Sequence, residues 1–151
     1  MKLELCTAST ADLPQLIELL GILFSQEAEL SPDPEKQRRA LLIILADPSR
    51  ARIYVARKNG KILAMAALHF TTSTAEGGKA AWFEDCIVRP EYRKKGIGKT
   101  LLEFVVAQAR AEGALRVMLL TDGDNERAQA LYRKIGFTDS AMLPMRLKLR
   151  G

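Results

Sequence analysis

The sequence predicts an α+β fold in which a central mixed, mostly antiparallel sheet is flanked by helices. Apolar residues recur at helical spacing in four segments, and compact apolar runs or alternations typical of strands lie between them. A strand, a glycine-containing loop, a helix and a further strand follow one another between residues 82 and 121, the order of a β-α-β unit. With 151 residues, 48% of them apolar, the chain is expected to form a single domain over residues 1–151 with its own core.

The first third of the chain predicts a strand and two helices. A strand over residues 2–7 leads into a helix, because Ser9 and Asp12 have the spacing of a capping box and apolar residues follow at helical intervals. A second helix is expected to begin at Asp33-Pro34 and to end before residue 48, which is also proline. The loop between these helices is acidic, with carboxylates at Glu27, Glu29, Asp33 and Glu35.

The middle of the chain predicts a hairpin and then the β-α-β unit. Strands over residues 52–57 and 61–70 flank Asn59-Gly60, a pair that tolerates the positive φ angles of a type I′ turn. A strand over residues 82–88 and a helix over residues 98–112 follow, and the apolar run at 115–121 is typical of a strand covered on both faces. The crossover of this unit is expected to be right-handed.

The last part of the chain predicts a helix and a closing strand. Apolar residues share one face of residues 126–135, and Gly136 supplies the stop signal of that helix. Apolar residues then alternate at Met145, Leu147 and Leu149, which predicts a strand at the end of the chain.

The positive charge of the chain is concentrated in one short segment. The formal net charge is +5, and the segment from residue 89 to 99 holds five basic residues and one acid. A face that binds duplex nucleic acid more often spreads its cations widely, so we expect a small phosphorylated ligand and no nucleic-acid partner.

Membrane insertion and metal chemistry are not expected. The longest apolar runs, at residues 40–46 and 62–68, have seven residues each, whereas a bilayer-spanning helix needs about 20. Acidic residues interrupt the first 25 positions, unlike a signal peptide, so a cytoplasmic location is expected. Cys6 and Cys86 lie far apart with His69 as the single histidine, which predicts no metal site and no disulfide framework.

The loop before the predicted helix at residue 98 is suited to an anion. Gly96 and Gly98 allow the backbone to approach a ligand, and the helix N-terminus offers unpaired N–H groups to phosphate oxygens. The Gly98-Lys99-Thr100 sequence is also the tail of a nucleotide-binding P-loop. That interpretation fails because a P-loop needs glycine at position 93, which here is arginine.

Two sequence patterns together resemble the GNAT superfamily of N-acetyltransferases. Residues 84–98 are similar to its acyl-CoA-binding segment, whose loop pattern Arg/Gln-x-x-Gly-x-Gly/Ala is matched by Arg93, Gly96 and Gly98. The family also has an asparagine at the start of the following helix, then alanine, Leu-Tyr and Gly-Phe. Residues 125, 128, 131–132 and 136–137 reproduce this pattern, and the order of elements matches over essentially the whole chain.

The resemblance implies acetyl-CoA as cosubstrate and a set of residues that hold it. In the family, amides of the glycine loop bind the pyrophosphate and the preceding strand binds the pantetheine arm, with help from the asparagine. The residues implied here are Ile87, Val88, Arg93, Lys94, Lys95, Gly96, Ile97, Gly98, Lys99, Thr100, Asn125 and Ala128. By analogy, the Val88 N–H would polarise the thioester carbonyl. Asn125 is also a good helix N-cap on general grounds.

The resemblance further implies transfer to a primary amine by direct attack in a ternary complex. Glu84 matches a base used by some family members, with Asp85 as the alternative because neighbouring strand residues face opposite sides. Tyr132 matches the general acid, although its place on an apolar stripe also suits a core residue. Cys86 lacks an activating histidine, so an acetyl-cysteine intermediate is not expected.

The acceptor and the assembly are less closely defined. The acidic loop between the first two helices favours a small cationic amine. Similar proteins are often dimers, so a homodimer is a possible assembly. A non-catalytic acyl-CoA-binding or regulatory module is the alternative function, because such a module would keep the glycine loop and use neither Glu84 nor Tyr132.

Overall fold

The computed structural model describes residues 2–27 and 29–150. Strands and helices follow one another in the expected order as far as α4, and two short 3-10 turns lie among them. The elements are β1 (Glu4–Thr7), α1 (Leu13–Gln26), α2 (Pro34–Ala46), β2 (Ala51–Lys58), β3 (Lys61–Ser73), β4 (Gly78–Val88), α3 (Ile97–Ala111), β5 (Val117–Leu119) and α4 (Glu126–Ile135).

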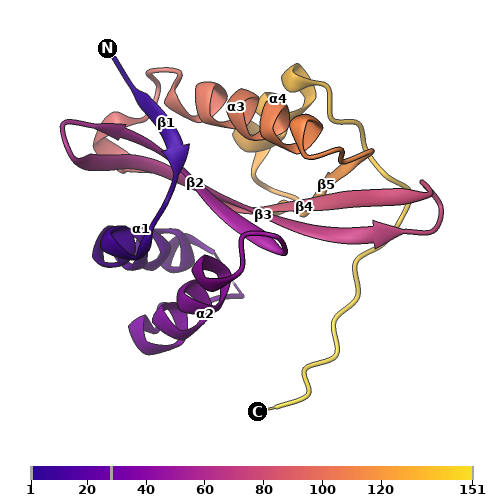
Figure 1. The fold of residues 1–151 in the computed structure, drawn as a ribbon, viewed down its shortest axis with the longest axis horizontal. Coiled ribbons are helices and arrows are strands. Elements are labelled where there is room, and N and C mark those ends of the chain that lie inside the picture. The colour runs from indigo at the N-terminus through magenta and orange to yellow at the C-terminus, as the bar shows by residue number, and fades with distance from the viewer. Residues whose placement is uncertain (1, 28, 151) are drawn as a thin grey trace.

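The strands form one mixed sheet in the order β1-β2-β3-β4-β5. The first four strands pair antiparallel, and β5 pairs parallel with β4. The parallel pair is joined through α3, so these three elements form the predicted β-α-β unit (Figure 1). The predicted α+β fold class, a mostly antiparallel sheet flanked by helices, is therefore confirmed.

Local signals in the sequence explain most element boundaries. Asn59 and Gly60 have φ angles of 50° and 78°, as the predicted type I′ turn between β2 and β3 requires. The Asp33 carboxylate accepts a hydrogen bond from the Lys36 N–H at 3.3 Å, which caps α2 directly before its proline. Gly136 follows α4 with a φ angle of 123°, a conformation that favours glycine.

Helices cover both faces of the sheet and enclose two apolar clusters. α1 and α2 pack on one face, around side chains such as Leu16, Val55 and Met65. α3 and α4 lie on the other face, where Leu68, Phe83 and Leu101 belong to the second cluster (Figure 1). The alternation of side chains along β3 and β4 supplies both clusters at once, because successive residues of a strand point to opposite faces.

A β-bulge interrupts the pairing of β3 with β4. Ala67 pairs with Glu84 and Met65 pairs with Ile87, so two residues of β4, Asp85 and Cys86, lie opposite one residue of β3. Asp85 has a φ angle of 56°, a left-handed conformation that aspartate tolerates better than most residues. The bulge bends β4 just before its carboxyl end.

β4 and β5 are in contact over only a short distance. The pairing is confined to Ala81–Phe83 of β4 and Val117–Leu119 of β5. Beyond Phe83, the edge of β4 that faces away from β3 has no strand beside it in the described residues. The sequence run at 115–121 predicted a longer strand here, and only its centre pairs with the sheet.

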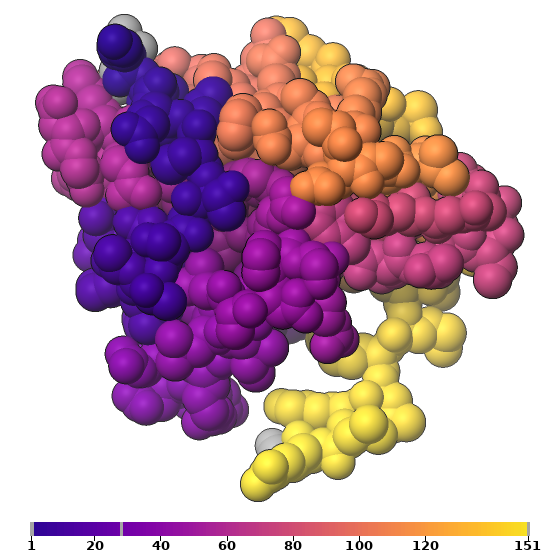
Figure 2. Space-filling view, viewed as in Figure 1, coloured from indigo at the N-terminus to yellow at the C-terminus, as the bar shows by residue number. Residues whose placement is uncertain are grey.

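The predicted closing strand is wrong in this structure. Residues 138–150 form no strand, and the side chains of Met145, Leu147 and Leu149 are 82 to 92% exposed. Alternating apolar residues indicate that the side chains would point to opposite sides of a strand. They do not supply a neighbouring strand, and no described strand pairs with this segment. In Figure 2 this segment, coloured yellow, projects from the body of the molecule.

Arg89 differs from the exposed cation that a basic segment suggests. Its side chain is buried, and its Nε donates a hydrogen bond of 2.6 Å to the carbonyl oxygen of Ile62. Its guanidinium also pairs with Glu18 of α1. Arg89 therefore joins α1 to the β3–β4 region and adds nothing to the exposed charge of the glycine loop.

Among the described residues, no helix has the length and apolar content needed to cross a membrane.

Candidate active site

The site lies where β4 and β5 separate, between the glycine loop, α4 and the end of α1. α3 begins at the carboxyl end of β4, directly after the loop that carries the two glycines. A Cβ atom on Gly98 would lie 3.4 Å from Val88 Cγ2 and 3.9 Å from Leu131 Cδ2. The first turn of α3 is thus packed against both the end of β4 and α4.

The glycine loop presents a row of free amide groups. Lys94 and Gly96 have φ angles of 65° and 80°, which fold the chain into α3. In the described part of the chain, the backbone N–H groups of residues 94–99 donate to no acceptor. The first backbone N–H of this region with a partner belongs to Thr100, which donates to the Gly96 carbonyl oxygen at 3.0 Å. Unpaired amides at a helix N-terminus bind anions, and they do so with the support of the helix dipole.

The basic side chains of this loop differ in what they contact. Arg93 is held on β4, because its Nε donates to the Val88 carbonyl oxygen at 3.0 Å. Lys94 and Lys95 are exposed, and the Lys95 ammonium lies 5.4 Å from the centre of the Tyr92 ring. The Thr100 hydroxyl donates to the Gly96 carbonyl oxygen at 2.9 Å. Lys94 and Lys95 are therefore placed to add positive charge beside the free amides.

The register of β4 directs the Val88 N–H to the open edge. The N–H of the next residue, Arg89, donates to the Leu63 carbonyl oxygen of β3 at 2.8 Å. Hydrogen-bonded and non-hydrogen-bonded pairs alternate in an antiparallel ladder, so the peptide groups of Val88 point away from β3. By the same alternation the peptide groups of Ile87 face β3, and its side chain is buried against α1.

Tyr132 of α4 lies at the point where β4 and β5 part. Its ring makes edge contacts with Phe83, the last β4 residue paired with β5, and with Phe137, at centroid distances of 6.2 and 6.0 Å. Burial, together with nearby Cys86 and Glu27, raises the pKa of the Tyr132 hydroxyl above its usual range. The hydroxyl is consequently protonated at neutral pH and available as a proton donor.

Asp85 is the carboxylate that the bulge brings into this region. The side chain is half-buried, and burial, with Glu84 and Glu27 as neighbours, raises its pKa to about 6. Glu27, at the end of α1, itself has a raised pKa because of burial and the nearby charge of Asp122. The charge of Glu27 therefore contributes to the raised pKa of both Asp85 and Tyr132.

Glu84 has a different environment from Asp85. Its side chain is 57% exposed, and its Oε1 lies 3.1 Å from His69 Nε2. The adjacent residues thus divide into one exposed carboxylate beside a histidine and one half-buried carboxylate beside Glu27. Glu84 is thus the more exposed of the two carboxylates, although its charge also contributes to the raised pKa of Asp85.

The remaining predicted residues take the following positions. Asn125 caps α4, because its side-chain oxygen accepts from the Ala128 N–H at 3.2 Å, while its amide nitrogen has no described partner. Of the acidic loop, only Glu27 joins the site: Asp33 caps α2, and Glu29 pairs with Arg146 at 2.9 Å. Asp122 and the bulge at Asp85 could not be recognised from the sequence, since no local pattern marks them.

Burial raises the pKa of the Cys86 thiol to about 12, so Cys86 is a poor nucleophile.

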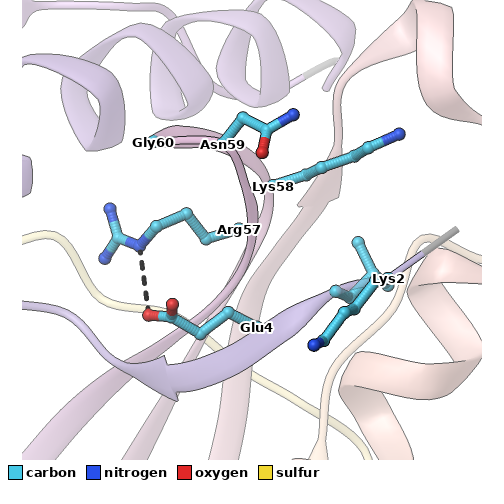
Figure 3. A pocket seen from close by; sticks show the side chains of 7 residues that line it. Lys2, Glu4, Arg57, Lys58, Asn59 and Gly60 are labelled. Carbon is cyan, nitrogen blue, oxygen red and sulfur yellow. Dashed lines mark ion pairs between the residues drawn. The ribbon is translucent and has the colours of Figure 1, made fainter.

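An open pocket lies apart from this site. An open pocket between β1 and the β2–β3 turn is lined by residues such as Lys2 and Arg57, and the Arg57–Glu4 ion pair of 3.7 Å lies beside it (Figure 3). None of the site residues lines it. Among the described residues, no group of three or more histidine, cysteine or carboxylate side chains is arranged to hold a metal ion.

Comparison with known proteins agrees with this fold. Residues 13–137 match the model of the acetyltransferase (GNAT) family. Glucosamine 6-phosphate N-acetyltransferase from Trypanosoma brucei brucei is 29% identical over 140 residues, which cover 89% of this chain and 88% of that protein. A putative acetyltransferase from Agrobacterium tumefaciens superposes with a TM-score of 0.82 at 27% identity, over 95% of this chain and 99% of the other.

A structure solved with acetyl-CoA has the same fold. It is that of a predicted acetyltransferase from Clostridium acetobutylicum, with a TM-score of 0.79 and 21% identity over 98% of this chain and 97% of that one. The fold and the family match define the protein as an acyltransferase. The chain belongs to the GNAT family of acetyltransferases.

Proposed function

We propose that this enzyme transfers the acetyl group of acetyl-CoA to the primary amine of a small cationic acceptor, by direct attack in a ternary complex. The observation that carries the proposal is the combination of a row of free amides at residues 94–99 with an open edge of β4 and a protonated Tyr132. Use of acetyl-CoA is typical of the family. A cytoplasmic location, where both substrates would be accessible, remains part of the proposal.

Acetyl-CoA fits the open edge as a substrate. The amides of residues 94–99 supply donors for its diphosphate, and Lys94 and Lys95 supply charge. Its pantetheine arm would lie along β4 where β5 is absent, opposite the free amide nitrogen of Asn125. The Val88 N–H would then donate to the thioester carbonyl oxygen, stabilising the negative charge that develops there during attack.

The acceptor amine must lose a proton before or during attack. An alkylammonium with a pKa of about 10.4 is almost entirely protonated at neutral pH. Asp85, with its pKa near 6, is ionised at pH 7 and more basic than an ordinary aspartate, as a general base should be. We therefore propose Asp85 as the base. Glu84, whose carboxylate is next to His69, is the alternative.

The reaction then balances with Tyr132 as the acid. The amine nitrogen forms a bond to the carbonyl carbon, and the carbon–sulfur bond breaks. An acceptor that arrives as an ammonium ion first releases one proton to solvent. During attack a second amine proton passes to Asp85, and the Tyr132 hydroxyl gives its proton to the departing thiolate of coenzyme A. The proton held by Asp85 then returns through solvent to the Tyr132 oxygen. No covalent enzyme intermediate is needed, in agreement with the protonated state of Cys86.

The charge around the acceptor space favours a cation. Burial and the nearby charge of Asp122 raise the pKa of Glu27, and burial with the nearby charges of Glu84 and Glu27 raises the pKa of Asp85. An ammonium group in this space would relieve that repulsion. The relative from Trypanosoma brucei brucei acts on the amine of glucosamine 6-phosphate, which supports a primary amine as acceptor and leaves room for acceptors of other shapes.

A panel of amines tests the proposal. Release of coenzyme A thiol is measured with acetyl-CoA and each of a set of polyamines, amino acids, amino sugars and amino-sugar phosphates. We expect turnover with at least one cationic amine. Binding of acetyl-CoA with no thiol release across the panel would instead favour a non-catalytic acyl-CoA-binding module.

The two carboxylates are separated by matched amide variants. Asp85→Asn should lower kcat by about 100-fold, whereas Glu84→Gln, which removes the same charge one residue away, should lower it by less than about threefold. The reverse order would assign the base to Glu84.

A further inference from the structure

We propose that Arg93 is a positioning residue that couples the acetyl-CoA side of the site to the acceptor side. The inference rests on the proposed function and adds to it a connection between the two substrates. The connection consists of the Arg93 guanidinium, the Val88 carbonyl oxygen at the end of β4 and the Gln26 side chain at the end of α1.

Arg93 is engaged within the protein through its backbone and its side chain. Its N–H donates to the Pro90 carbonyl oxygen at 3.3 Å, and its Nε donates to the Val88 carbonyl oxygen at 3.0 Å. The side-chain oxygen of Gln26 accepts from Nη1 and Nη2 of Arg93, at 3.3 and 2.9 Å, in the amide orientation that satisfies both groups. Every nitrogen atom of Arg93 thus has a partner in the chain, which leaves the proposed diphosphate contacts to the free amides of residues 94–99.

The shape of the guanidinium suits it to hold two elements in one arrangement. The group is planar and its N–H donors point in fixed directions, so one side chain can fix Val88 and Gln26 relative to each other. The side chain of Arg93 is half-buried, which limits competition from water. Hydrogen bonds from a charged donor are also stronger than those between neutral groups.

On the acetyl-CoA side, Arg93 leaves one backbone group of Val88 for a ligand. The peptide groups of Val88 point to the open edge of β4, and Arg93 occupies the carbonyl oxygen there. The Val88 N–H is therefore the group that remains for the thioester. Arg93 also directly precedes the row of free amides at residues 94–99, so a diphosphate that orders this row orders Arg93 as well.

On the acceptor side, Arg93 holds the end of α1. Gln26 is the last residue of that helix and directly precedes Glu27. The charge of Glu27 contributes to the raised pKa of both Asp85 and Tyr132. Binding of acetyl-CoA should therefore order the end of α1, and the ordered end should bind an ammonium group more tightly. Such a coupling between two ligands is reciprocal.

Hydrogen–deuterium exchange of the full chain, with and without acetyl-CoA, tests the connection in the absence of any acceptor. In the wild type, acetyl-CoA should slow exchange at residues 94–99 and, by about tenfold, in the last turn of α1. Gln26→Leu should keep the first effect and lose the second. Gln26→Glu, which retains an oxygen acceptor for the guanidinium, should keep both. Gln108→Leu makes the same change on α3 and is the control, which should behave as the wild type.

The outcomes separate this inference from the proposed function. If acetyl-CoA protects the loop but leaves the end of α1 unchanged, or still protects that end in Gln26→Leu, the coupling is overturned and the proposed function stands. If millimolar acetyl-CoA protects no part of the loop, the proposed function is overturned and the coupling with it.

Steady-state kinetics supply a readout that a purely structural role would not move. With an amine found in the panel, Gln26→Leu should raise the KM for the amine by about tenfold. The dissociation constant of acetyl-CoA, measured by calorimetry without amine, should change by less than about twofold. Gln26→Glu should restore the KM for the amine. An amine KM that is equal in the wild type and in Gln26→Leu would contradict the coupling.

Discussion

Single residues in the site acquire their properties from burial and from their neighbours. Tyr132 keeps its proton because its hydroxyl lies among buried groups and near Glu27, and Asp85 binds a proton more tightly than usual for the same reasons. One group is thus a proton donor and the other a proton acceptor at neutral pH. The raised pKa suits Asp85 to the proposed role of base near neutral pH, whereas the proposed role of Tyr132 as acid rests on its position beside the end of the β4–β5 pairing.

Removal of the Tyr132 hydroxyl tests its role as acid. Tyr132→Phe should lower kcat by about 10- to 100-fold, because the thiolate then leaves without a proton donor. The affinity for acetyl-CoA, measured by calorimetry, should change by less than about twofold, since the ring contact with Phe83 is kept. Tyr54→Phe, which removes the hydroxyl of a buried tyrosine on β2, is the control and should leave kcat unchanged. Equal turnover in Tyr132→Phe and the wild type would show that Tyr132 serves packing alone.

The raised pKa of Asp85 predicts a dependence of stability on pH. The folded state holds this proton up to about pH 6, whereas the unfolded chain releases it near pH 3.8. Ionisation of Asp85 therefore costs stability progressively between these values, and the cost is complete above pH 6.

Asp85→Asn removes that cost. At pH 8 it should raise the free energy of unfolding by about 1–2 kcal/mol, and the gain should vanish near pH 4. Asparagine also tolerates the φ angle of 56° at this position. Urea denaturation at the two pH values provides the measurement. A variant less stable than the wild type at pH 8 would contradict the burial argument.

At the scale of elements, the β4–loop–α3 segment was largely predictable and the end of the chain was not. The glycines, the following helix and the cap residues are local signals, so their elements appear where the sequence placed them. The bulge at Asp85 depends on how two strands pair, and no local pattern records it. The alternation of Met145, Leu147 and Leu149 is typical of a strand, but it does not show which other strand would pair with it. In the described chain no strand pairs with this segment.

The conformation of Gly96 gives a test of the loop. Its φ angle is 80°, where an L-residue pays about 1–2 kcal/mol. Gly96→Ala should therefore raise the dissociation constant for acetyl-CoA by about tenfold, as the amides of the loop lose their alignment. Gly21→Ala, in a helix with no neighbour within 4 Å of the new methyl group, is the control and should leave binding unchanged. Equal affinity in the wild type and Gly96→Ala, by calorimetry, would exclude the loop as the diphosphate site.

At the scale of the whole molecule, Arg89 joins the two parts that form the site. It connects Glu18 of α1 with the Ile62 carbonyl of β3 while lying directly after β4. Since Glu27 is at the end of α1 and Val88 at the end of β4, this connection helps to fix the proposed acceptor side against the proposed acetyl-CoA side. From the sequence, Arg89 was counted with the basic segment at residues 89–99, because a count of charges does not show which side chain is buried.

Arg89→Lys should show this connection as a loss of stability. A lysine cannot donate to Ile62 and pair with Glu18 in the same geometry, so the free energy of unfolding should fall by about 2 kcal/mol. Arg133→Lys, which changes an exposed ion pair with Asp139, should cost less than about 0.5 kcal/mol. Chemical denaturation measures both, and equal effects would mean that Arg89 has no special structural role.

The central claim is that the free amides of residues 94–99 and of Val88 receive acetyl-CoA at the open edge of β4. Titration of ¹⁵N-labelled protein with acetyl-CoA, followed by amide NMR, tests it most directly. The account predicts that the largest shifts occur at these amides and saturate together at micromolar ligand. Saturable shifts centred on another surface, or none at millimolar acetyl-CoA, would contradict it.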